Sequence, residues 1–340
     1  MISKVKEQLY PSSAYIGDFI RDEPSASEFE AMGAYVKEYL TQMPDKEVYV
    51  NLFPEYASST RLGTNTYEEH IDQYLSKVPT KMLGFDYYGL KSWGLETHFY
   101  SNYDLVRSKS LAKRMPYLAI TAAGGIGTSQ IDPIEKTLRW QVWASMAMGS
   151  KGISYFTYWT PDGAPNLVNN EYMIKRDGTK RDMYYWVQEV NADIKTIGKK
   201  LINCHADGAI ISYKTMYPLY RNNGNGITNY GPIQKVTGTD HYLCGCFRDA
   251  RRSENGENYK GYKALVTSQF PDVNEKANNT ISLTLDQSIG EIMFTHNNAV
   301  KTLQIDNTLN ESISDNVTVS YTGGVLTLSI PHGEAVLLEF

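Results

Sequence analysis

The chain has little of what marks a disulfide-rich, nucleic-acid-binding or membrane protein. Its 340 residues include three cysteines, which form no disulfide framework or zinc motif, so we expect buried or half-buried thiols. The net charge of -5, with scattered Lys and Arg, argues against a nucleic-acid partner. No hydrophobic run approaches the roughly 18 residues of a membrane span, and no signal peptide opens the chain. We therefore expect a soluble protein, cytoplasmic as the sequence stands and secreted or periplasmic if a signal lies upstream.

Common cofactor and nucleophile motifs are also absent from the sequence. The six histidines include no H-x-x-x-H pair, and there is no P-loop, no Gly-x-Gly-x-x-Gly after a strand and no Gly-x-Ser-x-Gly elbow. We therefore predict neither a metal site nor a cofactor. Tyrosine is abundant instead, with 26 residues against 10 phenylalanines. Its flat apolar face and polar tip suit proteins that bind polyhydroxylated ligands.

The first two thirds of the chain alternate between strand-like and helix-like segments. Five apolar segments read as strands, at 15–20, 47–53, 82–89, 116–125 and 152–159. Each leads into a segment of helical periodicity, which predicts a parallel sheet covered by helices. A (β/α)8 barrel needs eight such units. The five found here, after one short helical lead-in, predict a partial barrel without its first three units.

The pattern changes after about residue 203. Short segments with alternating apolar residues follow one another, separated by Gly, Asn and Asp turns. This pattern is typical of an antiparallel β-sandwich. We therefore predict an α/β plus all-β protein, with a partial (β/α)8 barrel at 1–203 and a C-terminal β-sandwich domain at 204–340.

Two adjacent carboxylates, Asp22 and Glu23, follow the first predicted strand, where the loops of a barrel form its active face. Asp22 lies too far ahead of the next helix to be its cap, a role that Ser25 or Ser27 fits better. Glu23, held in the turn before a proline, suits a proton donor. The alternative for Glu23 is a simple ion pair, with Arg21 as the nearest partner.

The next two strands supply further polar candidates. Asp86 is a possible second carboxylate, at a spacing from Glu23 of about 5–5.5 Å for a nucleophile or about 6.5–9.5 Å for an inverting base. Alternatively, Asp86 accepts hydrogen bonds from its own loop. Glu55 is another possible partner or a surface residue, and Asn51 either binds a substrate hydroxyl or holds its loop.

Aromatic residues at the strand ends are candidates for stacking on a sugar ring. Trp159 is the first choice, with Tyr158, Tyr87, Tyr88 and Trp93 as further candidates. The alternative is core packing between the two predicted domains. Another apolar group recurs at helical spacing and is predicted to form the buried face of a helix: Trp140, Trp143 and Met146.

With these residues in place, the chain resembles the TIM-barrel glycoside hydrolases of the retaining clan A superfamily, which includes the family 42 β-galactosidases. It is more closely similar to a group of bacterial barrel proteins related to them. The resemblance rests on "DEP", "VNLFPEYA" and "FDYY" after the first three strands, and on "LRWQVWASMAMGSKGISYFTYWTP" in the last barrel unit. It continues through "KRDGTKRDMYYWVQEVNADIKTIGKKL" to the terminal "GEAVLLEF", and so covers nearly the whole chain.

The resemblance implies that "DEP" ends barrel strand four, with Glu23 as the acid/base and Asp22 in place of an asparagine that contacts the sugar 2-hydroxyl. Strand seven ends in "ITAAGG" and lacks the expected nucleophilic glutamate. Either Asp86 supplies the second carboxylate, or the chain binds sugar without cleaving it. We therefore expect a glycosidase acting on an oligo- or polysaccharide or, alternatively, a non-catalytic carbohydrate-binding protein or an inactive fragment. Upstream sequence or another chain would complete the barrel.

Overall fold

The computed structural model describes residues 2–92, 94–126, 131–162, 171–212, 227–239, 241–250, 259–268 and 278–340. Its helical segments are α1 (Ile2–Gln8), η1 (Ala26–Glu28), α2 (Phe29–Gln42), α3 (Ser59–Leu62), α4 (Tyr67–Lys77), α5 (Phe99–Ala112), α6 (Glu135–Ala147) and α7 (Asp182–Leu201). The strands of the first half are β1 (Gly17–Asp22), β2 (Glu47–Asn51), β3 (Leu83–Asp86), β4 (Leu90–Lys91), β5 (Gly94–Leu95), β6 (Tyr117–Ala122) and β7 (Gly152–Phe156). None of the helices in the described ranges is long and apolar enough to cross a membrane.

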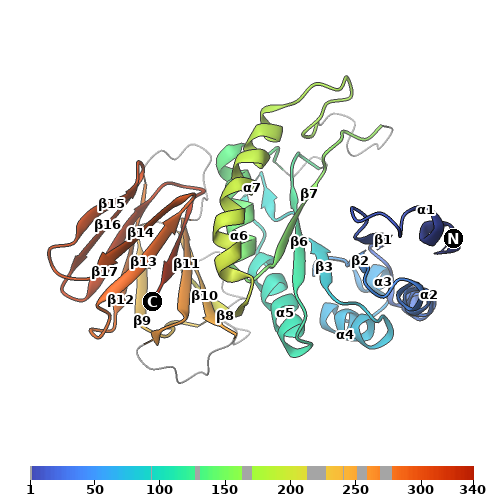
Figure 1. Cartoon of the computed structure of the whole chain (residues 1–340), viewed down its shortest axis with the longest axis horizontal. Coiled ribbons are helices and arrows are strands. Elements are labelled where there is room, and N and C mark those ends of the chain that lie inside the picture. Colours follow the sequence, from blue (N-terminus) through green and yellow to red (C-terminus); the bar gives the residue numbers. More distant parts are fainter. Residues whose placement is uncertain are drawn as a thin grey trace. The chain divides into compact units, whose positions relative to one another are not determined.

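The remaining strands follow in sequence order. They are β8 (Cys204–Ile211), β9 (Ile233–Gly238), β10 (Tyr242–Asp249), β11 (Tyr262–Ser268), β12 (Asn279–Leu285), β13 (Glu291–His296), β14 (Ala299–Gln304), β15 (Asn310–Ser314), β16 (Val317–Thr322), β17 (Val325–Ile330) and β18 (Ala335–Glu339). The chain divides into two compact units (Figure 1). Unit 1 is Met1–Tyr87 with Asn102–Ile120, and unit 2 is Tyr88–Ser101 with Thr121–Phe340. The domain boundary expected near residue 204 stays a prediction.

Unit 1 is built on parallel strands. β1 pairs with β2 in parallel, and the last residues of the two strands, Asp22 and Asn51, lie opposite each other. A parallel bridge joins Leu52 to Phe85, and β3 pairs in parallel with β6. The order is therefore β1, β2, β3, β6, as the alternation of strands and helices predicts for these four segments. The first strand extends to Asp22, two residues past its predicted end.

Helices α2 and α4 of unit 1 each bury one apolar face, and Figure 1 shows α2, α3 and α4 grouped beside the first strands. Phe29 and Val36 of α2 and Tyr74 of α4 are at most 1% exposed. The rings of Phe29 and Tyr74 meet edge to face, with their centroids 5.5 Å apart. At the start of the helical segment, the Ser25 amide donates to the Glu28 carboxylate over 2.9 Å, so this helix begins where the serines predict it.

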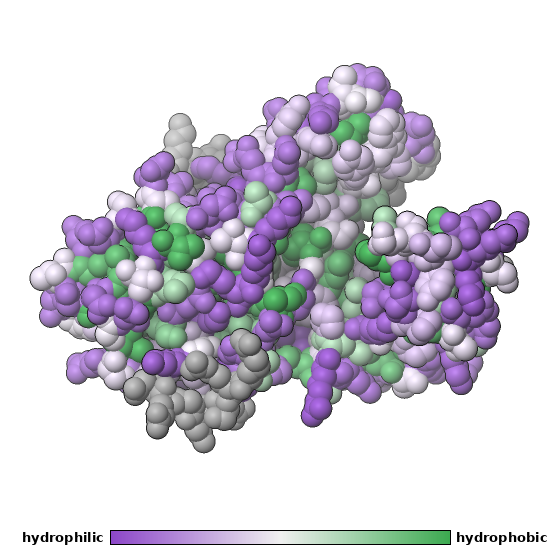
Figure 2. Space-filling model, in the orientation of Figure 1, coloured by the Kyte–Doolittle hydropathy of each residue, from purple (hydrophilic) through white to green (hydrophobic). Residues whose placement is uncertain are grey.

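Unit 2 contains two antiparallel sheets that share one apolar core. One sheet has the order β14-β13-β18-β11-β10-β8 and the other the order β15-β16-β17-β12-β9. Alternate side chains from both sheets, such as Phe294 and Leu328, fill the space between them. Hydrophilic and apolar residues are interspersed over the outer face of this part (Figure 2). The three cysteines are buried as expected: Cys204, Cys244 and Cys246. The predicted combination of α/β and all-β structure is therefore confirmed at this level.

Helix α6 packs closely against one of these sheets. Its predicted apolar face is confirmed, with exposures of 2% for Trp140, 0% for Trp143 and 5% for Met146. A Cβ on Gly245 of β10 would lie 2.1 Å from the Ala147 carbonyl oxygen at the end of α6. Only glycine allows the two backbones to approach this closely. The helix and the sheet are therefore in direct backbone contact within unit 2.

A buried ion cluster joins α6 to its two neighbours in unit 2. Arg139 of α6 donates to Asp193 of α7 over 2.8 Å and to Glu334, in the turn before β18, over 2.9 Å. All three side chains are at most 14% exposed. A guanidinium presents several donors in a fixed plane, so one side chain can satisfy two carboxylates at once. Arg139 therefore fixes the helix pair onto the sheet.

Removing Arg139 should destabilise the protein strongly, because buried Asp193 would lose its cation and buried Glu334 would keep only His296, 3.5 Å away, as a basic neighbour. We expect Arg139→Met to lower the free energy of unfolding by about 3–5 kcal/mol, measured by urea denaturation. The control is Lys175→Met, which removes a cation 3.9 Å from Glu171 whose side chain is 38% exposed. That change should stay within about 0.5 kcal/mol of the wild type. Equal effects of the two substitutions would contradict a structural role for the cluster.

Candidate functional site

Polar side chains gather where the first three strands of unit 1 end. Asp22 is the last residue of β1, Asn51 the last of β2 and Asp86 the last of β3, and Glu23 follows Asp22 directly. Because these neighbouring strands are parallel, their carboxyl ends lie at one edge of the sheet. The structure therefore brings together four of the residues that the sequence predicts for the site.

The Asn51 side chain joins two of the carboxylates. Its amide nitrogen donates to the Asp22 carboxylate and to the Asp86 carboxylate, each over 2.9 Å. The two accepting oxygens are therefore no farther apart than twice that distance. Asn51 is 4% exposed, and among the described residues its buried amide oxygen has no hydrogen-bond partner. An acceptor in this position can bind a donor brought by a ligand, because burying it without a partner costs free energy.

Glu23 is held in an unusual backbone conformation. Its φ angle is 43°, in the left-handed region that non-glycine residues seldom adopt. The Glu23 amide donates to the Asn51 carbonyl over 2.8 Å, which continues the pairing of β1 with β2 by one residue. The turn therefore fixes the side chain just past the strand end, as the position before Pro24 suggests.

The ion pair of Glu23 differs from the expected one. The Glu23 carboxylate contacts Arg61 of α3 over 2.6 Å, and the Arg61 guanidinium lies 4.7 Å from the centre of the Phe53 ring. Arg21, the partner considered from the sequence, pairs with Glu28 instead, over 2.5 Å. On an extended strand the side chains of Arg21 and Glu23 would point to the same face of the sheet. The turn at Glu23 ends the extended conformation, so the two side chains do not meet. The Glu23 side chain is 25% exposed and can still contact solvent.

Burial and mutual repulsion perturb the ionisation of the two candidate carboxyl groups. Burial raises the pKa of Asp86 to about 7, the charges of Glu23 and Asp22 add to the rise, and the hydrogen bond from Asn51 opposes it. Burial also raises the pKa of Glu23, with the Arg61 cation opposing and the Asp22 charge adding to the rise. Asp86 therefore stays partly protonated at neutral pH, which is the condition for a carboxyl group to act as an acid.

Buried phenols lie near Asp86, and the sequence analysis did not single them out. Burial raises the pKa of Tyr49, and the Asp86 carboxylate adds to the rise. The same two causes raise the pKa of Tyr67, in the first turn of α4. Within the described ranges neither hydroxyl has a hydrogen-bond partner. No sequence signal marks either residue, because both read as ordinary apolar positions of a strand and a helix.

Two further candidates in unit 1 lie at the margin of this cluster. The backbone amide of Glu55 donates to the side chain of Asn102 over 2.7 Å, and Glu55 is half-buried. Tyr87 is 2% exposed, and its ring lies 5.1 Å from that of Tyr56. Glu55 therefore lies at the protein surface only in part, and Tyr87 belongs to the core.

The remaining aromatic candidates belong to unit 2. Tyr158 is 57% exposed and Trp159 is 49% exposed, so neither is a core residue. Tyr88 is half-buried, with its ring 6.1 Å from that of Phe156. Trp93 lies outside the described residues.

Tyr158 lines a cavity of about 500 Å³ between β7 and α7 in unit 2. Its walls combine the rings of Tyr155 and Tyr184 with the amide side chains of Gln188 and Asn191. The Tyr155 hydroxyl donates to Asn191 over 2.7 Å. Rings beside fixed donors and acceptors form a surface that suits a ligand with both apolar and hydroxylated faces.

The described residues contain no group of three or more His, Cys, Asp or Glu side chains placed to hold a metal ion. The carboxylates of Asp22 and Asp86 instead share the Asn51 amide, and the Glu23 carboxylate pairs with the Arg61 guanidinium. The chemistry that this arrangement can support is proton transfer and charge stabilisation by carboxyl groups.

No protein-family model matches the chain, and no curated protein matches it. Among solved structures, it is similar to a β-galactosidase from Bacillus circulans sp. alkalophilus, with 11% identity over 92% of this chain and 66% of that chain and a TM-score of 0.49. It is also similar to a β-galactosidase from the haloarchaeon Halorubrum lacusprofundi, with 15% identity over 51% of this chain and 26% of that chain and a TM-score of 0.38. A third similar structure is the catalytic module of a family 98 glycoside hydrolase from Streptococcus pneumoniae TIGR4, with 8% identity, 100% and 82% coverage and a TM-score of 0.38.

The chain spans about a quarter of the haloarchaeal β-galactosidase and just under two thirds of the Bacillus one. None of the three TM-scores reaches one half. We therefore argue the chemistry of the site from the side chains of this chain.

The raised pKa of Asp86 should make the stability of the protein depend on pH. The folded state keeps a proton up to about pH 7 that the unfolded chain releases near the ordinary value of 3.8, so stability falls as the pH rises between these values. Asp86→Asn keeps the side chain neutral and should raise the free energy of unfolding at pH 8 by up to about 4 kcal/mol. Urea denaturation at pH 4, 6 and 8 measures this, with Glu30→Gln as the control, because the Glu30 side chain on α2 is exposed. Parallel pH profiles for wild type and Asp86→Asn would refute the raised pKa.

Proposed function

We propose that this protein acts on a glycosidic bond by acid–base chemistry, with Glu23 and Asp86 as its two carboxyl groups. The observation that carries the proposal is the Asn51 amide shared between Asp22 and Asp86, which gathers carboxyl groups at the ends of parallel strands. Glycoside cleavage needs two carboxyl groups in different protonation states, flanking one bond. The resemblance drawn from the sequence names the same reaction and the same Glu23.

The electrostatics favour one assignment of roles. Asp86, with a pKa raised to about 7, holds a proton at neutral pH and acts as the acid that protonates the leaving oxygen. Glu23, next to the Arg61 cation, acts as the anion that either attacks the sugar or activates a water. Asp22 and Asn51 contact sugar hydroxyls. This assignment exchanges the roles that the resemblance alone implies for Glu23 and its partner.

We propose that β1, β2, β3, β6 and β7 correspond to strands four to eight of a (β/α)8 barrel, with a β-sandwich domain from residue 204. The parallel pairing of β1 with β2 and of β3 with β6 supports this. On and next to β1, Phe19 is 58% exposed and Ile16 is 77% exposed. Exposed apolar residues on a terminal strand suit pairing with further strands, which upstream sequence or another chain would supply.

A second function, carbohydrate binding without cleavage, is favoured by the cavity of unit 2 that Tyr158 lines. Aromatic rings and amide side chains occur together in its walls, as sugar binding requires. Such binding needs no second carboxylate. It is therefore the function that would remain if the carboxyl groups of unit 1 did not support catalysis.

Hydrolysis of glycosides tests the catalytic proposal. We expect activity on a panel of aryl and alkyl glycosides, and a loss of about 10²–10⁴-fold in kcat for both Asp86→Asn and Glu23→Gln. Loss of the acid should be most severe on alkyl glycosides, because their poor leaving groups need protonation. If Asp86 is the acid, kcat/KM should also fall as the pH rises past about 7.

The matched control is Glu30→Gln, an exposed carboxylate outside the site, which should retain wild-type rates. Activity on alkyl glycosides that survives Asp86→Asn but not Glu23→Gln would reverse the two roles. Glycan binding without turnover in any preparation would refute the enzyme and leave the binding function.

The binding function makes a separate prediction. Tyr158→Ala should weaken the binding of an oligosaccharide by about fivefold to tenfold, measured by titration calorimetry, because a stacking surface is lost. Tyr185→Ala is the control, since Tyr185 is also exposed on α7 but does not line the cavity. Equal losses for the two variants would argue against binding in this cavity.

A further inference from the structure

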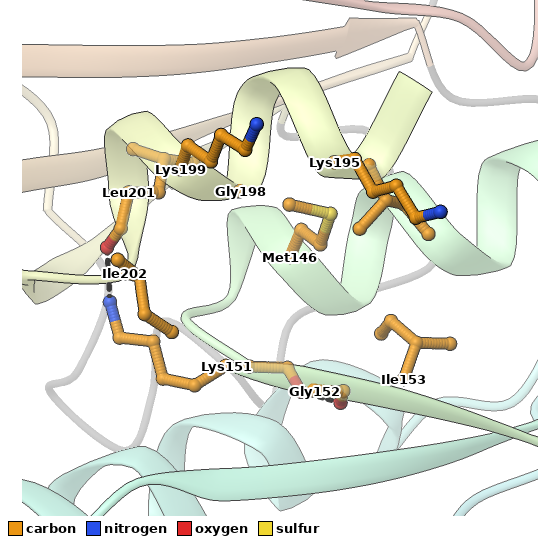
Figure 3. Close-up of a pocket in the computed structure, with 11 residues that line it drawn as sticks. Met146, Lys151, Gly152, Ile153, Lys195, Gly198, Lys199, Leu201 and Ile202 are labelled. Carbon is orange, nitrogen blue, oxygen red and sulfur yellow. Dashed lines mark hydrogen bonds between the residues drawn. The ribbon is translucent and has the colours of Figure 1, made fainter. Parts of the chain in front are cut away.

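A second cavity in unit 2 differs in character from the one that Tyr158 lines. It has a volume of about 280 Å³ and lies between the end of α6, the start of β7 and the last turns of α7 (Figure 3). Its apolar surface comes from the following residues: Met146, Ile153, Ile194, Leu201 and Ile202. Ile202 is 50% exposed, so the apolar surface reaches the solvent. Such a surface favours a hydrocarbon group.

The charged residues around this cavity all have the same sign. Lys151, Lys195 and Lys199 line it, and none of the described residues lining it is acidic. Figure 3 shows the three ammonium groups at different sides of the cavity, with the Lys151 stem along one wall. Three cations without a lining carboxylate favour an anionic ligand.

Lys151 is the most buried of these cations. Its ammonium donates to the carbonyl oxygens of Leu201 over 2.6 Å and Cys204 over 2.7 Å. An ammonium has three donors, so one remains for a ligand. Burial lowers the pKa of Lys151 to about 8, and a bound anion would favour its charged form.

Gly198 forms part of the wall, and no contact within the described chain explains it. It lies inside the 20-residue helix α7, where glycine costs roughly 1 kcal/mol relative to alanine. A Cβ at this position would meet only the Ile194 side chain, at an ordinary distance of 3.8 Å. The missing side chain keeps the cavity open along α7.

We propose that this cavity binds an amphiphilic carboxylate, with its hydrocarbon chain against the apolar wall and its carboxylate attracted by the combined positive charge of the three lysines that line the cavity. A sugar fits poorly, because among the described residues that line the cavity the only polar side chain besides the lysines is that of Ser150, whose hydroxyl donates to the Gly152 carbonyl over 2.7 Å. Hydroxyl groups buried against such a wall would lose their hydrogen bonds to water. The site is therefore independent of the proposed action on carbohydrate.

Titration calorimetry of the full chain with octanoate and with 1-octanol tests the proposal. We expect saturable binding of octanoate at one site, about tenfold tighter than that of octanol, since only octanoate gains the charged contacts. Gly198→Leu fills the cavity and should abolish the binding of both probes. Equal affinities for the two probes, or unchanged binding in Gly198→Leu, would overturn the proposal.

Further variants separate binding from folding. Lys151→Met should lower the octanoate affinity about tenfold and leave the octanol affinity unchanged, but this lysine also bonds the end of α7 and its loss can unfold the protein. The double variant Lys195→Met, Lys199→Met changes exposed residues only and should weaken octanoate binding without moving the thermal midpoint. Lys235→Met is the matched control and should bind like the wild type, because the Lys235 side chain is exposed on β9 and does not line the cavity. If the double variant and this control bind octanoate equally well, the lysines have no part in binding.

Discussion

The candidate site depends on one hydrogen-bonding group, the Asn51 amide nitrogen, which lies between Asp22 and Asp86. Two carboxylates this close together would repel each other if both were ionised and nothing lay between them. The amide donates to both, and it is itself placed by the parallel pairing of β1 with β2. The site therefore depends on the register of the sheet, in which Asp22 lies opposite Asn51. A shift of this register by one residue would turn the two side chains to opposite faces.

The sequence predicts this arrangement in part. The alternation of strands and helices gives the parallel order of unit 1, and that order places Asp22, Asn51 and Asp86 at the same edge. It does not give the ion pair of Glu23, because Arg61 comes from α3, a single turn capped by Ser58. Arg21 was closer in sequence and was the natural candidate. The ion pair of Glu23 with Arg61 depends on the turn at Glu23, and no residue pattern in the sequence predicts the positive φ of this turn.

The two candidate sites of the proposed function would contact a ligand through different kinds of side chain. In unit 1 the carboxyl group of Asp86 is buried and that of Glu23 is partly buried, so their ionisation is set by desolvation and by neighbouring charges. In unit 2 the aromatic side chains after β7 are about half exposed and uncharged. They offer an apolar surface on which a ligand can stack, but no acid or base for catalysis. The sequence does not reveal how Tyr49 and Tyr67 are perturbed, because the shift depends on the burial of their hydroxyl groups and on the proximity of acidic side chains, Asp86 first among them.

The contact of α6 with β10 through Gly245 affects how the chain can be divided. The composition changes at residue 204, but the direct backbone contact and the Arg139 cluster both cross that point in the sequence. A segment cut at residue 204 would lose the helix that covers β10 and leave Glu334 without its cation. We therefore expect α6, α7 and the sheet that contains β10 to unfold together, because the backbone contact at Gly245 and the Arg139 cluster hold them to one another.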